Sequence, residues 1–188
     1  MRGMKAPLVA LAVALCATPA LADPLGEALD AAGGSLCFQR VETPPAGQQW
    51  KTALMSMSRD AGGVPTLRLR LEGKDKPLLI YASCGWLDEI NRGAGGRILD
   101  PTFLPASGVT CFMRTGTDEE AGSFPMSWDG GQTVQAHLPF SVAAWRGWDT
   151  RREATWPQIA AADRIIRVSR APAEACAELN AKFGPKTG

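Results

Sequence analysis

The sequence contains only one histidine and one tyrosine among its 188 residues. A serine hydrolase triad would have to use His137 as its base. No Gly-x-Ser-x-Gly turn accompanies it. Strand alternation places His137 on a polar face with Thr133 and Gln135, which favours an ordinary surface residue. Asp88 and Glu89 are adjacent in sequence and would point different ways on a helix, so they make a poor acid–base pair.

An excess of either charge is also absent. The chain has 20 lysines and arginines against 19 aspartates and glutamates, which gives a formal net charge of +1. Nucleic-acid binding requires a clustered positive excess that can neutralise phosphates. The balance of charge therefore argues against nucleic acid as a partner.

Long hydrophobic runs are missing except at the N-terminus, where an apolar run extends from Leu8 to Cys16. This run is shorter than the roughly 20 residues that span a bilayer. Arg2 and Lys5 precede it, and an Ala-x-Ala site ends at Ala22, so the pattern is typical of a secretory signal peptide over residues 1–22. We therefore expect one exported domain over residues 23–188, periplasmic or secreted, with no transmembrane segment after cleavage.

No two cysteines have the Cys-x-x-Cys spacing of a redox motif or a zinc knuckle. The exported chain would keep an even number of cysteines, which favours two structural disulfides. Those cysteines are Cys37, Cys84, Cys111 and Cys176. We predict no cofactor and no metal.

The methionine side chains leave open one alternative, which is a metal site with thioether ligands. Met55 and Met57 share one strand face, and Met113, Met126 and His137 lie elsewhere in the sequence. Thioether and imidazole groups suit Cu(I). Methionine more often fills gaps in a hydrophobic core, which is the interpretation that we favour.

The feature most clearly present is a hairpin between Thr66 and Trp86. Leu67, Leu69 and Leu71 alternate with charged residues, which predicts a strand with one buried face. A short charged turn over 73–76 leads to a second apolar run that begins at Leu78. A helix over 24–32 and strands over 35–41 and 50–59 are expected before this hairpin.

Short motifs then recur along the chain. The sequence Cys-Phe-Gln-Arg at Cys37 is echoed by Cys-Phe-Met-Arg at Cys111, and each copy continues to a Met-Ser segment, a glycine turn and an alternating strand. A helix follows over 172–184. The pattern predicts an α+β fold, mostly antiparallel sheet with short helices. It would comprise two tandem β-β-β-β-α repeats, over 36–92 and 110–184, packed as one disulfide-stapled domain. Chance similarity of strand-and-turn sequences is the alternative.

Self-contained repeats would pair Cys37 with Cys84 and Cys111 with Cys176. Four cysteines allow three connectivities, and sequence alone does not choose among them. The repeat makes this pairing the simplest of the three.

The second copy contains a long segment over 139–163 that has three of the six tryptophans. Long connections in compact domains are often functional. The hypothesis is a binding loop, in which tryptophans offer flat faces and arginines bind anions. Its candidate residues are Trp145, Arg146, Trp148, Arg151 and Arg152. The alternative is that the tryptophans turn inward as a satellite core. The binding hypothesis predicts that replacing Trp145 or Trp148 weakens a partner at unchanged stability.

Binding is therefore the preferred function, with catalysis second. The sequence predicts a periplasmic or secreted protein that engages a protein or glycan of the cell envelope through this segment. A small envelope hydrolase with Asp or Glu chemistry is the alternative. The missing motifs favour a non-enzyme, and the oligomeric state is left open.

Overall fold

The computed structural model describes residues 23–40, 43–44, 46–87, 108–115, 120–128, 132–150 and 152–184. The expected signal peptide lies outside these ranges. So do the helical turn expected over 87–92, except for Leu87, and the candidate binding residue Arg151.

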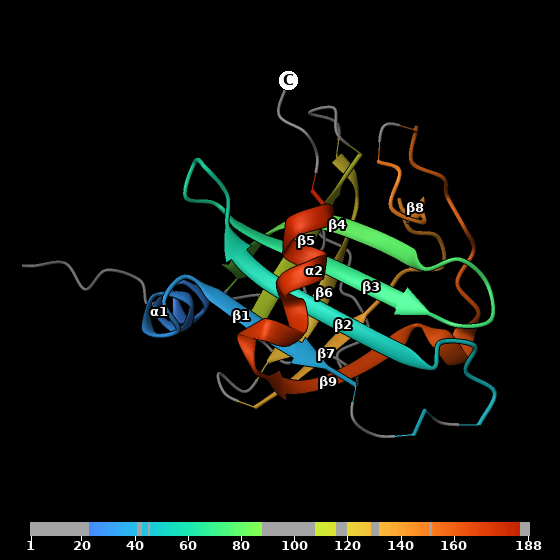
Figure 1. Ribbon diagram of the computed structural model, residues 1–188, viewed down its shortest axis with the longest axis horizontal. Coiled ribbons are helices and arrows are strands. Elements are labelled where there is room, and N and C mark those ends of the chain that lie inside the picture. Colours follow the sequence, from blue (N-terminus) through green and yellow to red (C-terminus); the bar gives the residue numbers. More distant parts are fainter. Residues whose placement is uncertain are drawn as a thin grey trace, which may run out of the picture.

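Eight antiparallel strands form a closed barrel (Figure 1). Each strand pairs with its neighbour in sequence, and the pairing of the first with the last closes the ring. A two-residue strand, β8 (Trp145–Arg146), pairs with the start of β4 outside the ring. The barrel strands are β1 (Ser35–Gln39), β2 (Thr52–Arg59), β3 (Pro65–Glu72), β4 (Leu78–Leu87), β5 (Gly108–Arg114), β6 (Glu120–Trp128), β7 (Thr133–His137) and β9 (Ile165–Ala171).

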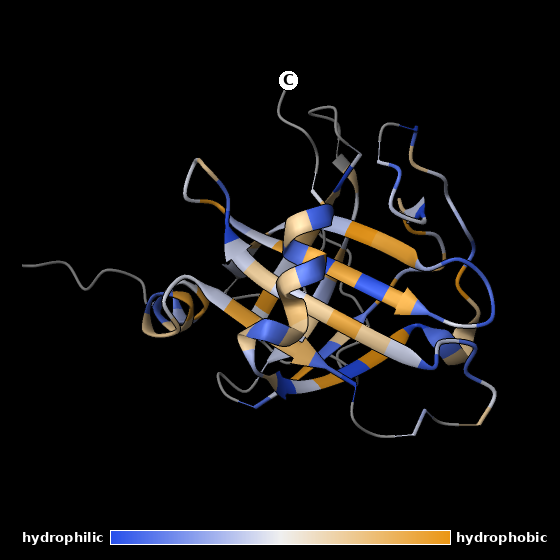
Figure 2. Cartoon of the chain, in the orientation of Figure 1, coloured by the Kyte–Doolittle hydropathy of each residue, from blue (hydrophilic) through white to orange (hydrophobic). Residues whose placement is uncertain are grey.

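Side chains fill the barrel interior. The predicted alternation on β3 is confirmed, because Leu67, Leu69 and Leu71 are fully buried while Arg68 and Arg70 face outward. Figure 2 shows this alternation as bands of orange and blue along the strands. Met55 and Met57 are also fully buried in the same core cluster, as expected of gap-filling methionines. An eight-stranded barrel is just wide enough for its own side chains, and here they occupy it.

Two segments close the ends of the barrel. Helix α1 (Pro24–Ala31) covers one end, and its Leu25 and Leu29 are fully buried in the core cluster. The helix stops at Gly33 and Gly34, whose φ angles of 70° and 91° suit glycine. The 139–163 segment covers the other end and contributes Val142, Ala143, Ala144 and Ile159 to the same cluster.

The C-terminal segment packs against the outside of the barrel, across β2 and β3 (Figure 1). It consists of a 3-10 turn, η2 (Ala173–Cys176), followed by helix α2 (Ala177–Lys182). Leu179 and Phe183 form a second buried cluster with Leu79, Tyr81 and Trp145. Among the described residues, no helix combines the length and apolar character needed to cross a bilayer.

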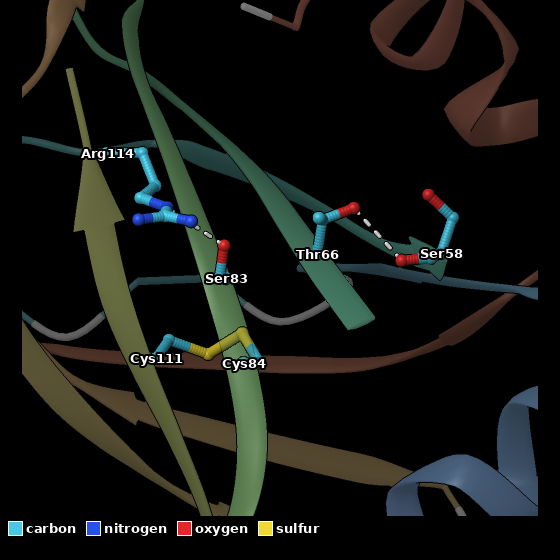
Figure 3. The surroundings of a disulfide bond; sticks show 6 residues. All are labelled: Ser58, Thr66, Ser83, Cys84, Cys111 and Arg114. Atoms are coloured by element: carbon cyan, nitrogen blue, oxygen red, sulfur yellow. Dashed lines mark hydrogen bonds between the residues drawn. A yellow bond between two sulfur atoms is a disulfide. The ribbon is translucent and has the colours of Figure 1, made fainter. Parts of the chain in front are cut away.

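All four expected cysteines form disulfides, but the pairing predicted from the repeat is wrong. Cys37 pairs with Cys176, and Cys84 pairs with Cys111. Figure 3 shows the second bond between neighbouring strands β4 and β5, where the two cysteines face each other in register. The order of the strands explains the pairing, because β4 and β5 are neighbours in the barrel, and closure places β1 beside β9, which leads into η2 with Cys176. Both bonds therefore join the halves that self-contained repeats would keep apart.

The expected fold class is therefore correct in its coarse features. The chain is mostly antiparallel sheet with short helices and two disulfides. The sheet closes into one barrel, which the sequence did not predict, and the tandem repeat is not shown by the structure.

Candidate binding site

The 139–163 segment folds back on itself at one end of the barrel. Isolated bridges join Ser141 to Gln158 and Ala144 to Thr155. The amide of Ile159 donates to the carbonyl of Phe140 at 2.7 Å. These antiparallel contacts, together with the buried residues of the segment, hold it in a fixed shape.

Trp145 turns inward. Its side chain is only 3% exposed, and its indole Nε1 donates to the carbonyl oxygen of Arg152 at 2.9 Å. Its ring meets that of Phe183 edge to face, with 5.7 Å between centroids. For this tryptophan the structure shows the satellite core of the alternative interpretation, and the ring offers no flat face to a partner.

Trp148 is half-buried, and cations of the same chain contact its ring. The guanidinium carbon of Arg70 lies 5.0 Å from the ring centroid, and Nζ of Lys182 lies 5.7 Å from it. Glu178 accepts hydrogen bonds from both cations, at 3.2 Å and 2.7 Å. The hydrogen bond from Lys182 is the largest influence on the pKa of the Glu178 carboxyl, and together with the charge of Lys182 and the bond from Arg70 it lowers that pKa.

The two described arginines of the segment face solvent. Arg146 is exposed on β8, and Arg152 is exposed with its Nε 3.4 Å from a carboxylate oxygen of Asp149. The structure thus separates the five predicted residues. Trp145 and Trp148 pack against the barrel, Arg146 and Arg152 point outward, and Arg151 lies outside the described residues.

Exposed apolar side chains lie on this segment and next to it instead. We call Phe140, Trp156 and Ile165 the apolar rim; they are 52%, 54% and 42% exposed. Among the described residues, Val64 at 43% is the other large hydrophobic side chain with comparable exposure, and it lies in the β2–β3 turn near α1. The guanidinium carbon of Arg164 lies 5.3 Å from the ring centroid of Phe140, so the rim mixes aromatic and cationic groups.

A cleft of about 520 Å³ adjoins the apolar rim at Ile165. Of the residues that the structure describes, those of the β1–β2 connection form one wall, and those at the end of the 139–163 segment and in β9 form the other. Its polar lining includes Arg40, Gln48, Arg167 and Ser169. The volume of the cleft lies within the range that is usual for ligand-binding sites.

Arg40 lies at the edge of this cleft with most of its donors unused. Its Nη1 donates to the carbonyl of Trp50 at 2.7 Å, and the other donors have no partner in the described part of the chain. Burial lowers the pKa of Arg40, and the negative charge of Asp163 partly opposes that shift. Asp163 is 1% exposed, and its Oδ1 accepts a hydrogen bond from the backbone N–H of Gln49 at 2.8 Å.

Gln48 supplies an acceptor on the same side. Its amide nitrogen donates to the carbonyls of Ala162 and Ile165, at 2.7 Å and 3.3 Å. Two carbonyls can face only the NH₂ group, so the amide orientation is fixed by its partners. The amide oxygen Oε1 is buried and has no partner among the described residues.

Comparison with protein-family models, with curated proteins and with solved structures gives no match. The function must therefore be argued from the geometry of the site, because function depends on the site and not on the fold.

A polar track leads away from the cleft across the outside of the barrel. Nη2 of Arg167 donates to Oε1 of Gln135 at 3.0 Å, and the amide nitrogen of Gln135 lies 3.1 Å from Nε2 of His137. The hydroxyl of Ser127 lies 3.3 Å from the same ring nitrogen. Burial lowers the pKa of His137, so the neutral ring is favoured. The polar face expected for this histidine is thus present.

The sequence patterns did not point to Arg40, Gln48 or Arg167, and they indicated no contact role for Phe140 or Trp156. Alternation along Ile165, Arg167 and Ser169 was the one local signal, since it marks the solvent face of a strand. The described residues contain no cluster of three histidines, cysteines or carboxylates that could hold a metal.

Proposed function

We propose that this chain is an exported binding protein that engages a partner protein through the apolar rim and the adjoining cleft. The observation that carries the proposal is the concentration of exposed apolar side chains at one end of the barrel. Phe140, Trp156 and Ile165 all lie at the end covered by the 139–163 segment. The proposal keeps the binding segment predicted from sequence and moves the contact residues away from Trp145 and Trp148.

The chemistry of this end favours a protein over a glycan. Aromatic and arginine side chains are enriched at protein interfaces and often dominate their binding energy. The apolar rim offers both kinds, because Arg164 lies against Phe140. The cleft itself is lined by aliphatic and polar side chains, and none of its described lining residues provides an aromatic face for a sugar ring.

The packed interior and the composition of the cleft also bear on the alternatives. Because core side chains fill the barrel, a ligand has to bind at the surface. The described lining residues of the cleft include no carboxylate and no histidine, the groups that acid–base hydrolysis would require. Binding is therefore favoured over the envelope hydrolase. Two disulfides are more typical of a periplasmic or extracellular protein than of a cytosolic one, which supports export.

We also propose that β1–β4 and the last four barrel strands derive from one duplicated unit. The echoed motifs at Cys37 and Cys111 support this proposal. Any such halves no longer stand alone, because both disulfides cross between them.

Site-specific photo-crosslinking in cells that make the protein tests the binding proposal. The photoreactive residue p-benzoylphenylalanine replaces Trp156 in one variant and Val64 in a matched control, which has similar exposure near the α1 end. We expect a discrete protease-sensitive adduct at position 156 alone, the same partner being identified by mass spectrometry each time. An excess of the purified chain should compete for that adduct, and the Phe140→Ser/Trp156→Ser variant should not.

The controls decide the result. Equal adducts at positions 64 and 156, or no adduct at 156, would contradict the proposal. An adduct that survives protease and is removed by glycosidases would assign the surface to a glycan instead.

A further inference from the structure

We infer that the cleft binds the carboxylate side chains of an extended acidic polypeptide segment. The inference rests on the proposed function and names the chemistry of the partner at that site. Three features carry it: unused arginine donors, a fixed unpaired acceptor and an aliphatic wall.

The arginines define the charge of the ligand. Arg40 and Arg167 are the charged residues among the described lining of the cleft. Each guanidinium carries five N–H donors in a planar fork that matches a carboxylate. Each makes one hydrogen bond within the described chain, Arg40 to the Trp50 carbonyl and Arg167 to Gln135. The remaining N–H groups can donate to one or more carboxylates without breaking an existing bond.

Burial makes this interaction stronger than an ordinary surface ion pair. Arg40 is partly desolvated, which lowers its pKa and leaves its charge poorly compensated by water. Asp163 offsets that effect only in part, since its charge raises the pKa of Arg40 by less than burial lowers it. An incoming anion would compensate the rest.

Gln48 defines a second requirement. Its Oε1 is buried without a partner, and the carbonyls of Ala162 and Ile165 prevent the amide from turning over. An unpaired buried acceptor has a free-energy cost. A ligand donor would remove that cost once a small shift of the half-buried Gln48 side chain opens Oε1 to the cleft. The ligand therefore carries an N–H or O–H donor beside its carboxylate, as the backbone amides of a peptide do.

The remaining lining favours a polypeptide. Ala161, Ala162 and Ile165 make an aliphatic wall, and Ile165 belongs to the apolar rim as well as to the cleft. An acidic segment of the partner that contacts the rim would thus continue into the cleft. A volume of about 520 Å³ accommodates a few residues of extended chain.

Calorimetry on the purified full chain tests the inference without the partner. The probes are N-acetyl-tetraglutamate amide, its tetraglutamine analogue, an acrylate tetramer with four carboxylates and no N–H, and tetragalacturonate. We expect the glutamate peptide to bind most tightly. The acrylate should bind more weakly because it cannot donate to Gln48, and the glutamine peptide should bind least.

Arg167→Gln is the diagnostic variant and Arg146→Gln is the matched control. Both arginines are exposed, so both variants should fold, but only Arg167 lines the cleft. Loss of a charge-assisted hydrogen bond should weaken the glutamate peptide by about 10- to 100-fold in Arg167→Gln. Arg146→Gln should stay within about twofold of the unmodified chain.

Several results would overturn the inference. Equal weakening by the two variants would mean diffuse charge attraction, and equal binding of acrylate and peptide would remove the donor requirement. Tighter binding of tetragalacturonate would assign the cleft to an acidic glycan. The Phe140→Ser/Trp156→Ser variant should still bind the glutamate peptide. If the crosslinking test fails while the glutamate peptide still binds, the proposed function is wrong and this inference stands. If the crosslink forms while the glutamate peptide does not bind, this inference is wrong and the proposed function stands.

Discussion

The guanidinium carbon of Arg70 lies 5.0 Å from the ring centroid of Trp148, so a cation of β3 covers the tryptophan of a segment more than 70 residues away. Lys182 of α2 approaches the same ring, and Glu178 bonds to both cations. Three distant parts of the chain therefore meet at one side chain. Trp148 stabilises the protein here, and Trp156 is the tryptophan of the segment that stays exposed.

The three tryptophans of the 139–163 segment should differ in their effect on stability. Trp145→Ala should lower the free energy of unfolding by about 3–5 kcal/mol, because a buried ring is lost. Trp148→Ala should cost about 1–2 kcal/mol through its cation contacts and partial burial. Trp156→Ala should stay within about 0.5 kcal/mol, because its ring is exposed. Urea unfolding measures all three.

The affinity for the crosslinked partner should be measured on the same variants. Trp156→Ala should lower that affinity, although the free energy of unfolding is unchanged. A loss of stability for Trp156→Ala as large as that for Trp145→Ala would show that the rim is structural.

Local patterns predicted local structure well. The leucine alternation of β3, the charged turn and β4 all follow from neighbouring residues, as do α1 and its glycine stop. Closure of the barrel depends on the pairing of β1 with β9, in which Cys37 lies opposite Ala171. No sequence periodicity encodes a partner that far away, so the closure and the bond between Cys37 and Cys176 were missed. The bond between Cys84 and Cys111 was missed because the repeat hypothesis placed the two cysteines in separate units.

The candidate site shows the same limit. Its arginines come from positions 40 and 167, and Gln48 reaches the carbonyls of Ala162 and Ile165 more than 110 residues away. The sequence indicated that the 139–163 segment was unusual. Whether each tryptophan points inward or outward depends on contacts with β3, β4 and α2, which the sequence pattern does not contain.

The two disulfides should make unequal contributions. The bond between Cys37 and Cys176 spans 139 residues, and that between Cys84 and Cys111 spans 27. On the loop-entropy model the longer loop contributes roughly 5 kcal/mol and the shorter roughly 3.5 kcal/mol. We expect Cys37→Ala/Cys176→Ala to be less stable in urea than Cys84→Ala/Cys111→Ala.

Limited proteolysis separates the two variants further. Loss of the bond to Cys176 should expose α2 to cleavage, and loss of the β4–β5 bond should not. Peptide mass mapping of the unreduced protein checks the connectivity. Finding Cys37 linked to Cys84 would contradict the barrel as described.

Acid should destabilise the protein through His137. Burial lowers the pKa of its ring below the ordinary 6.5, so the folded state binds a proton less readily than the unfolded state. The stability that the neutral His137 ring contributes is fully present above pH 6.5, and it is lost as the pH falls from 6.5 through the pKa of the folded state. We expect His137→Gln to flatten the dependence of unfolding free energy on pH in that range.

Glu178 provides an internal comparison. Its pKa is lowered from 4.5, so its contribution is lost only at more acidic pH. Glu178→Gln should therefore leave the slope just below pH 6.5 unchanged. An unaltered slope in His137→Gln would assign the effect to another group.

Asp163→Asn should change stability and binding in opposite directions. The aspartate is 1% exposed, accepts the amide of Gln49 and partly neutralises Arg40. Asparagine keeps an acceptor oxygen but removes the charge, which should cost about 1–3 kcal/mol of stability because Arg40 loses its counter-charge. The same loss makes the cleft more positive, so the glutamate peptide should bind several-fold more tightly. Urea unfolding and calorimetry on one preparation measure both quantities. Weaker peptide binding would mean that the carboxylate shapes the cleft and that its charge does not limit the affinity for anions.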